Sequence, residues 1–335
     1  MPALAFPLAA ARDLLVEAVG VWLRLLKVLV PALLVVEALD ALGAVDALGA
    51  LLSPLTGALG LPDWAGVVWA ATLLTNLFTG MALLFGFIEA GAVPSVAEMS
   101  TLGALMLIGH SLPVEGAVAR RAGVPWSVTI ALRVGGALVF AALVHGAYSV
   151  LGLGEAPARI AWRPEVPDEG ALGWVVALLG TLATVFLIIL ALMALLRVLR
   201  ALGVERLVHL ALVPVLRALG IGPTAANVTV IGVVLGLTYG AGLVIRDVDE
   251  GRVDRRDAVL VLCFLGLLHA VIEDTLLIAA LGADLVAILW ARVAFSIAVV
   301  AVLARCLPAR AFAPPGEGAA GHRAREDGPR GGASG

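Results

Sequence analysis

Two short stretches of the sequence, HSLPVE and HAVIED, place a histidine and one or two carboxylates inside runs that are otherwise apolar. An arginine follows each histidine at the same spacing, in the next apolar run. Histidine changes its charge near neutral pH, and ionisable groups inside a membrane often mark pathways for solutes or protons. We therefore interpret this doubled set as a candidate pathway. Its members are His110, Glu115, Arg133, His269, Glu273, Asp274 and Arg292.

The depth of these groups in a membrane would make them costly. His110 precedes and Arg133 follows Gly123, where we expect a hairpin to turn at the membrane face. Their separations from that glycine correspond to about 15–20 Å of helix, close to the midplane of a hydrocarbon core about 30 Å thick. Each arginine at that depth costs about 2.5–3.5 kcal/mol on insertion scales. These groups must therefore face partners or water.

A purely structural role for the charged groups is the alternative. Arg133 would pair with Glu115. Arg292 would pair with Glu273 or Asp274, so that each pair holds one helical hairpin together. A single histidine in such a run would be interpreted as a core residue with a satisfied hydrogen bond. Its repetition together with an acid and an arginine favours the pathway.

Two further apolar runs, 63–88 and 224–246, have polar centres that contain glycine. The segment from Pro62 to Asn76 would make about 20 Å of helix, so a hairpin tip there would reach the midplane. Broken helices at such tips bind solutes in secondary transporters. Alternatively the glycines, including Gly242, only allow close helix packing. The candidate tip residues are Thr75, Asn76, Thr79, Gly80, Thr238, Tyr239 and Gly240.

The composition indicates a membrane protein that crosses the bilayer several times. Apolar residues make up 61% and charged residues 14% of the chain, against about 45–50% and 25% in soluble domains. The two cysteines, Cys263 and Cys306, are too far apart for a disulfide framework or a zinc motif. Nucleotide-binding glycine motifs and HExxH are absent from the sequence. We expect no enzymatic activity, no cofactor, no resident metal and no nucleic-acid partner.

A self-comparison indicates a tandem duplication. Residues 41–61 and 201–221 share eight of 21 positions, including a central proline. When the sequence is shifted by 159 residues, His110, Glu115 and Arg133 align with His269, Asp274 and Arg292. The expected units are an N-terminal segment (1–19), repeat 1 (20–152), an external connector (153–170), repeat 2 (171–306) and a disordered cytoplasmic tail (307–335).

Each repeat is expected to contain the same four elements, which makes an all-α polytopic fold. They are a spanning helix, an interfacial helix, a re-entrant or broken hairpin, and a two-helix hairpin. The expected spans are 20–40, 98–120, 124–150, 172–196, 257–280 and 284–305, and the expected interfacial segments are 41–60 and 201–220.

The distribution of Lys and Arg favours two repeats of opposite orientation. If 63–88 and 224–246 are re-entrant, the cytoplasmic side receives 16 of the 22 basic residues and the outside receives two. If both are full spans, four arginines of 197–217 move to the outside. The sequence thus predicts inverted repeats in the cytoplasmic (inner) membrane, with a retained N-terminus and both termini in the cytoplasm.

Several of these segments resemble a known family. The stretch ALGALLSPLTGALGLP, the hairpin centred on TNLFTG, and HSLPVEGAVARRAG are similar to the nucleoside recognition, or Gate, domain. Concentrative nucleoside transporters, spore maturation proteins A and B, and the membrane part of ferrous iron transport protein B share that domain. The resemblance covers about 20–150, with 175–305 as a diverged second copy. It implies a membrane fold that handles solutes, built from inverted repeats as in the nucleoside transporter core.

We therefore expect a permease-like protein that handles a small polar solute, such as a nucleoside, an anion or an ion, at a midplane site in the bilayer. Coupling to protons or sodium and assembly into a homo-oligomer are left open. The first alternative is a non-transporting membrane assembly factor of the spore maturation type. The remote alternative is an intramembrane metalloenzyme that uses His110 and His269.

Overall fold

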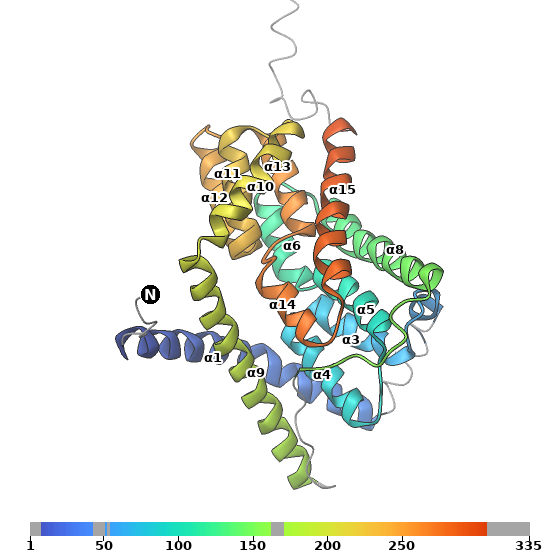
Figure 1. Ribbon diagram of the computed structural model, residues 1–335. Helices are drawn as coiled ribbons and strands as arrows, with labels where there is room; N and C mark the ends of the chain where they lie inside the picture. The colour runs from blue at the N-terminus through green and yellow to red at the C-terminus, as the bar shows by residue number, and fades with distance from the viewer. Residues whose placement is uncertain (1–7, 43–50, 52–53, 162–170, 307–335) are drawn as a thin grey trace, which may run out of the picture.

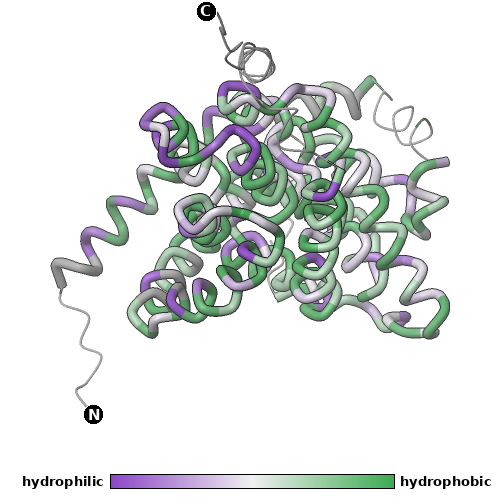
Figure 2. The backbone as a smooth tube through the Cα atoms, turned by 90° about the horizontal axis from the view of Figure 1, so that it is seen from above, coloured by the Kyte–Doolittle hydropathy of each residue, from purple (hydrophilic) through white to green (hydrophobic). Residues whose placement is uncertain are grey.

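The computed structural model describes residues 8–42, 51, 54–161 and 171–306, and these are helical without a β-strand (Figure 1). Apolar residues run along most helices, and hydrophilic residues gather largely at loops and helix ends (Figure 2). The prediction of an all-α polytopic membrane protein is confirmed. Four segments of the described chain are long and apolar enough to cross a membrane: Val96–Arg121, Trp126–Leu151, Leu178–Leu199 and Val286–Cys306.

The first half of the chain begins with a long helix and continues with shorter ones. Its elements are α1 (Leu8–Ala41), α3 (Asp63–Leu74), α4 (Leu77–Glu89), α5 (Val96–Ile108), α6 (Leu112–Arg121), α7 (Trp126–Ile130), the π-helix η1 (Ala131–Gly135) and α8 (Gly136–Leu151).

The second half repeats this order. The helices α11, α12 and α13 follow α3, α4 and α5 at nearly the same offset along the chain. Each half also contains one π-helix, which precedes its last α-helix. The elements are α9 (Ala171–Ala201), α10 (Val204–Ala218), α11 (Pro223–Leu235), α12 (Leu237–Asp249), α13 (Arg255–Leu267), α14 (Glu273–Ala280), η2 (Val286–Ala291) and α15 (Arg292–Cys306).

Two of the expected spans are not among the four candidates. The run 20–40 lies within α1, a continuous helix of 34 residues, and its assignment as a span stays a prediction. The run 257–280 is divided between α13 and α14, each too short to cross alone. The interfacial segment 41–60 lies largely outside the described residues, whereas its counterpart 201–220 contains α10.

The runs 63–88 and 224–246 form helical hairpins. Their arms of 12 or 13 residues extend about 18–20 Å, which is less than a hydrocarbon core. The arms cross closely at equivalent positions. A Cβ added at Gly80 would lie 1.7 Å from Thr72 Oγ1, and one added at Gly240 would lie 2.8 Å from the Cα of Gly232. These glycines therefore allow the two arms of each hairpin to pack together.

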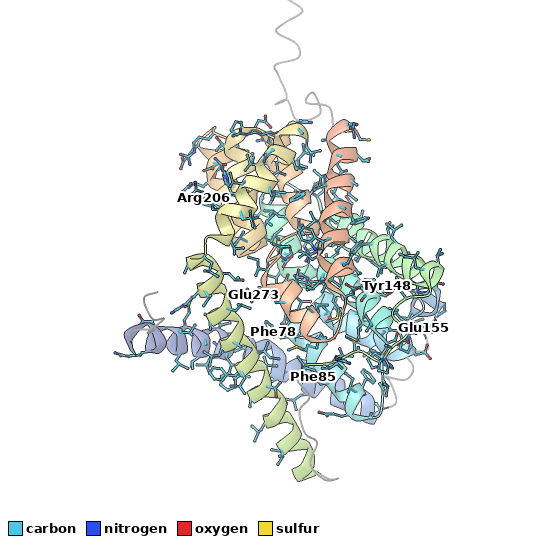
Figure 3. All side chains as sticks on the ribbon, viewed as in Figure 1. Phe78, Phe85, Tyr148, Glu155, Arg206 and Glu273 are labelled. Carbon is cyan, nitrogen blue, oxygen red and sulfur yellow. The ribbon has the colours of Figure 1, made fainter. Side chains whose placement is uncertain are left out.

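The loop before α5 and the connector after α8 lie together at one end of the molecule. The connector after α8 lies along the start of α5, where the backbone N–H of Ala97 donates to the carbonyl of Gly154 at 2.9 Å. The end of α14 joins it, because the N–H of Ala161 donates to the carbonyl of Ala280 at 2.8 Å. Figure 3 places Glu155 of this connector at the right of the view.

The loops of the second half gather elsewhere, at the top of Figure 1. Arg256, at the start of α13, donates to the carbonyl of Gly220 at 3.3 Å and to that of Ala304 at 3.0 Å. The N–H of Gly222 donates to Asp257 Oδ2 at 2.6 Å. Equivalent loops of the two halves thus lie at different ends, and the hairpin turn of the second half accompanies the loops of the first.

Candidate functional site

The candidate site forms where α5 and α13 break. Each helix ends just before a histidine, and the residue after that histidine has a left-handed backbone, with φ 48° at Ser111 and φ 43° at Ala270. Few residues other than glycine adopt this conformation, so its occurrence at equivalent positions marks a repeated, strained turn. The hairpins α3–α4 and α11–α12 support both turns. Ser111 N–H donates to the Thr72 carbonyl at 3.1 Å, and Val271 N–H donates to the Val233 carbonyl at 2.9 Å.

The turns bring the edges of the two histidine rings together, with the ring planes tilted by 53°. Their Nε2 atoms are 3.1 Å apart, and the side chains are 5% and 3% exposed. On the other side of each ring, His110 Nδ1 lies 2.9 Å from the Met106 carbonyl, and His269 Nδ1 lies 2.6 Å from the Leu265 carbonyl. The histidines, which are far apart in the sequence, therefore form one centre shared by both halves.

Each acid of the centre approaches the histidine of the other half. Glu115 Oε1 lies 3.2 Å from His269 Nε2 and 3.5 Å from His110 Nε2. Asp274 Oδ2 lies 3.8 Å from His110 Nε2. Both carboxylates are buried. The centre is thus built from reciprocal contacts between the two repeats.

The two arginines lie behind this centre and are almost completely buried, at 2% and 0% exposed. Arg133 Nη1 lies 2.7 Å from Glu115 Oε2 and donates to the Gly266 carbonyl at 2.9 Å. Its Nη2 donates to the His110 carbonyl at 2.5 Å. Arg133 therefore pairs with Glu115 and also bonds backbone carbonyls freed by both helix breaks.

Arg292 differs from its counterpart. Its Nε donates to the Leu267 carbonyl at 3.0 Å, and its Nη2 donates to the His269 carbonyl at 3.4 Å. Within the described chain Arg292 forms no ion pair with Glu273 or Asp274, so the pairing expected in the second half is wrong. The reason is that the broken end of α13 offers carbonyl acceptors directly in front of the guanidinium.

Glu273 lies apart from the six groups of the centre. It is the first residue of α14, and Figure 3 labels it where α14 meets α9. Burial raises the cost of charging such a carboxyl, and no described residue forms a hydrogen bond or ion pair with it. Its neighbour Asp274 is the acid of the second half that reaches the histidines.

The hairpin tips contribute structure close to the centre. Thr75 Oγ1 donates to the Ala71 carbonyl at 2.6 Å, and Asn76 Oδ1 accepts from the Thr79 backbone N–H at 3.0 Å as the N-cap of α4. These polar groups are therefore used to end one helix and begin the next. The side chains of Thr238 and Tyr239 lie outside the described residues.

Little space remains beside the centre. A cavity of about 10 Å³ reaches the Glu115–Arg133 pair from between α6, η1, α12 and α13, and it has room for about one water molecule. Thr129 and Cys263 also line it. A cavity of this size suits a proton, an ion or a water molecule.

Sequence reasoning missed two features of the site. The pairing of Glu115 with His269 was not predicted, because a repeat indicates which residues are equivalent and not which ones touch. The strained residues Ser111 and Ala270 carry no signal in their residue type. A metal was also not expected, yet His110, His269 and Asp274 each offer one ligand atom, all within 4.8 Å of one another.

Comparison with known proteins gives one informative relative. The chain is 30% identical over 275 residues to the uncharacterized membrane protein YvoD of Bacillus subtilis (strain 168), and the match covers 80% of this chain and 85% of YvoD. No family model matches the chain, and no solved structure matches it significantly. The similarity to YvoD supports the membrane character of this chain. Membership of the nucleoside recognition family stays a prediction.

Proposed function

The chain belongs to the family of the Bacillus subtilis membrane protein YvoD, and on that premise we propose that it is a permease-like protein for a small charged or polar solute. The solute would be handled at the centre where the two broken helices meet, in the cytoplasmic membrane. The proposal contains no enzymatic step. Coupling to a proton would use the two histidines.

The observation that carries the proposal is the convergence of six buried ionisable groups from both halves. Each half contributes a histidine, an acid and an arginine, and each acid approaches the histidine of the other half. Burying such groups is expensive in a membrane, and intramembrane ionisable residues commonly mark pathways for ions or solutes. Scaffolding alone would be served by the arginines and their carbonyl acceptors, without two histidines in contact.

The arrangement of the loops supports the inverted orientation. Equivalent loops lie at different ends of the molecule, as described for the groups around Gly154 and Gly220. Short hairpins of 12 or 13 residues per arm support the re-entrant assignment. In secondary transporters of this architecture, the solute site lies near the midplane, at the interface of the repeats.

The narrow centre favours an ion over a nucleoside. The first hairpin tip uses Asn76 for capping, and the cavity beside Glu115 accommodates about one water molecule. A nucleoside would require a wider opening of the halves than an ion. We therefore propose an ion or proton as the solute that best fits this centre.

Purified protein reconstituted into liposomes tests the permease proposal. Movement of radiolabelled uridine, inorganic phosphate and Mn²⁺ would be followed, and a trapped dye would report lumenal pH. We expect one probe or the pH signal to exceed that of empty liposomes, and Glu115→Gln to abolish the excess. If no probe and no proton moves faster than in empty liposomes, the permease proposal fails and the assembly-factor alternative gains support.

A further inference from the structure

We propose that the centre binds one divalent transition-metal cation of the class that accepts mixed nitrogen and oxygen ligands, such as Mn²⁺, Fe²⁺ or Zn²⁺. This inference deepens the proposed function by naming the ligand class of the same site, and it rests on that function for the transport step alone. The proposed ligand atoms are His110 Nε2, His269 Nε2, Glu115 Oε1 and Asp274 Oδ2.

The hydrogen bonds of the histidines leave lone pairs pointing at each other. A backbone carbonyl only accepts hydrogen bonds, so His110 Nδ1 beside Met106 O and His269 Nδ1 beside Leu265 O must each carry a proton. In a neutral ring the other nitrogen, Nε2, is then an acceptor. The two Nε2 atoms nevertheless lie 3.1 Å apart. A cation between them, either a proton or a metal ion, removes this conflict.

The two carboxylates add further acceptors to the same point. Glu115 Oε1 lies 3.2 Å and 3.5 Å from the two Nε2 atoms. Asp274 Oδ2 lies 3.8 Å from His110 Nε2 and is a buried atom without a hydrogen-bond partner. The residue is 8% exposed, so water does not readily compensate that oxygen. An unpartnered acid oxygen beside the two histidine rings is the observation that favours a metal over one shared proton.

The spacing of these atoms fits metal coordination. Nitrogen and oxygen ligands about 2.0–2.2 Å from a tetrahedral metal are separated from each other by about 3.3–3.5 Å. Four separations, those among the two histidine nitrogens and Glu115 Oε1 and that from Asp274 to His110, are 3.1–3.8 Å and bracket that value. Asp274 is farther from His269, within 4.8 Å, so it would have to move by about 1 Å toward that ring to complete the set.

The side chains proposed as ligands also have the partners that usually orient metal ligands. Ligating histidines commonly donate their second ring N–H to a backbone carbonyl, and ligating carboxylates accept a hydrogen bond on their free oxygen. Both histidines meet the first condition, and the free Oε2 of Glu115 forms an ion pair with Arg133 at 2.7 Å.

The donor set selects the class of cation. Two imidazoles with two carboxylates suit manganese, iron or zinc. Mg²⁺ and Ca²⁺ prefer oxygen ligands throughout, so they are expected to bind far more weakly. Soft cations such as Cu⁺ prefer sulfur, which none of the four ligand atoms supplies.

Equilibrium binding to the full chain in detergent tests the inference without requiring transport. Titration with Zn²⁺ and Mn²⁺, and with Co²⁺ for its ligand-field absorption, would be compared among wild type, His110→Gln, His269→Gln and Asp274→Asn. His209→Gln is the matched control, because His209 is exposed and pairs with Asn227 away from the centre. We expect about one ion per chain and a loss of about 10–100-fold in affinity for each variant of the centre.

Each outcome has a defined meaning. Binding that His209→Gln preserves and the centre variants lose, in proteins that remain monodisperse and helical, supports the site. No stoichiometric binding, or binding that survives in the His110→Gln/His269→Gln double variant, overturns it and leaves a shared proton as the occupant. Should the double variant not fold, the wild-type Co²⁺ spectrum decides, since a spectrum without nitrogen ligation overturns the site. Binding without flux in liposomes would refute the permease proposal alone.

Discussion

The two buried arginines occupy equivalent positions in the two halves, but they contact different partners and are expected to contribute differently to stability. Arg133 meets both a carboxylate and carbonyl groups, whereas Arg292 meets carbonyl groups. Removing a guanidinium from a buried carboxylate leaves an unpaired charge, while removing it from carbonyls leaves neutral acceptors. The sequence repeat alone suggests equal roles.

The first prediction compares these two residues. Arg133→Gln is expected to lower the free energy of unfolding by about 3–5 kcal/mol, because Glu115 loses its partner. Arg292→Gln is expected to cost less, about 1–3 kcal/mol. Unfolding in detergent by heat or denaturant measures both, with Lys27→Gln as the exposed control. Equal losses for the two arginine variants would contradict the assigned partners.

A second residue with a predictable role is Asp247, which lies in the last turn of α12. Asp247 is buried, and Arg252 donates to its Oδ1 at 2.5 Å. This hydrogen bond with the Arg252 guanidinium holds the pKa of the Asp247 carboxyl below its usual value. A depressed folded-state pKa contributes stability above the unfolded pKa of about 4, and that stability is lost as the pH falls through the lower, folded value.

Asp247→Asn is therefore expected to lower the thermal midpoint at neutral pH and to have little effect in acid. The loss is about 1 kcal/mol, since Arg252 is half-exposed and its attraction is screened. Asp249→Asn, an exposed neighbour, serves as the control. A destabilisation that is the same at every pH would show that the ion pair does not carry the effect.

At the scale of elements, the hairpins α3–α4 and α11–α12 depend on small residues where their arms cross. Gly80→Ala places a Cβ 1.7 Å from Thr72 Oγ1, so we expect a clear loss of thermal stability. Thr72→Ala removes the obstructing oxygen and is expected to restore much of it in the double variant. Gly86→Ala, at a position with no atom within 4 Å, is expected to be neutral or stabilising. Thermal midpoints measure all three, and tolerance of Gly80→Ala alone would contradict the crossing.

The broken helices give another prediction at this scale. Ala270 holds a left-handed backbone, which glycine adopts freely and a β-branched residue resists. Ala270→Gly is expected to be tolerated within about 1 kcal/mol, and Ala270→Val to destabilise the protein by about 1–3 kcal/mol. Ala298→Val, on an exposed face of α15, is the control for the added methyl groups. If valine is as well tolerated at Ala270 as at Ala298, the turn is not strained.

At the scale of the whole molecule, the inverted arrangement predicts which loops share a side of the membrane. In a Cys306→Ser background, Glu155→Cys and Leu285→Cys are expected to react with an impermeant thiol reagent added to intact cells. Asp249→Cys and Arg121→Cys are expected to react only after lysis. All four positions are exposed, and Cys263 is buried. Labelling of Leu285→Cys and Arg121→Cys from the same side would indicate parallel halves.

Much of the architecture could be predicted from the sequence because it depends on local pattern. The hairpin turns at Gly123 and Gly282 are present, with φ of 100° and 91°. The run 20–40 lies within the continuous helix α1, and its assignment as a span stays a prediction.

The candidate site was predicted by residue type and not by contact. His110, Glu115, Arg133, His269 and Asp274 do converge. The crossing of each acid to the opposite histidine depends on how two repeats pack, and a self-comparison carries no information on packing. Asn76 was interpreted as a solute ligand, whereas its side-chain oxygen accepts a hydrogen bond from the backbone N–H of Thr79 and caps α4.

The most direct measurement is anomalous diffraction from crystals of the full chain soaked in Co²⁺ and recorded at the cobalt edge. If the centre binds a metal ion, one strong anomalous peak from Co²⁺ is expected about 2.0–2.2 Å from both His110 Nε2 and His269 Nε2. Histidines of the two halves found apart, or a peak elsewhere with the centre empty at saturating Co²⁺, would contradict it.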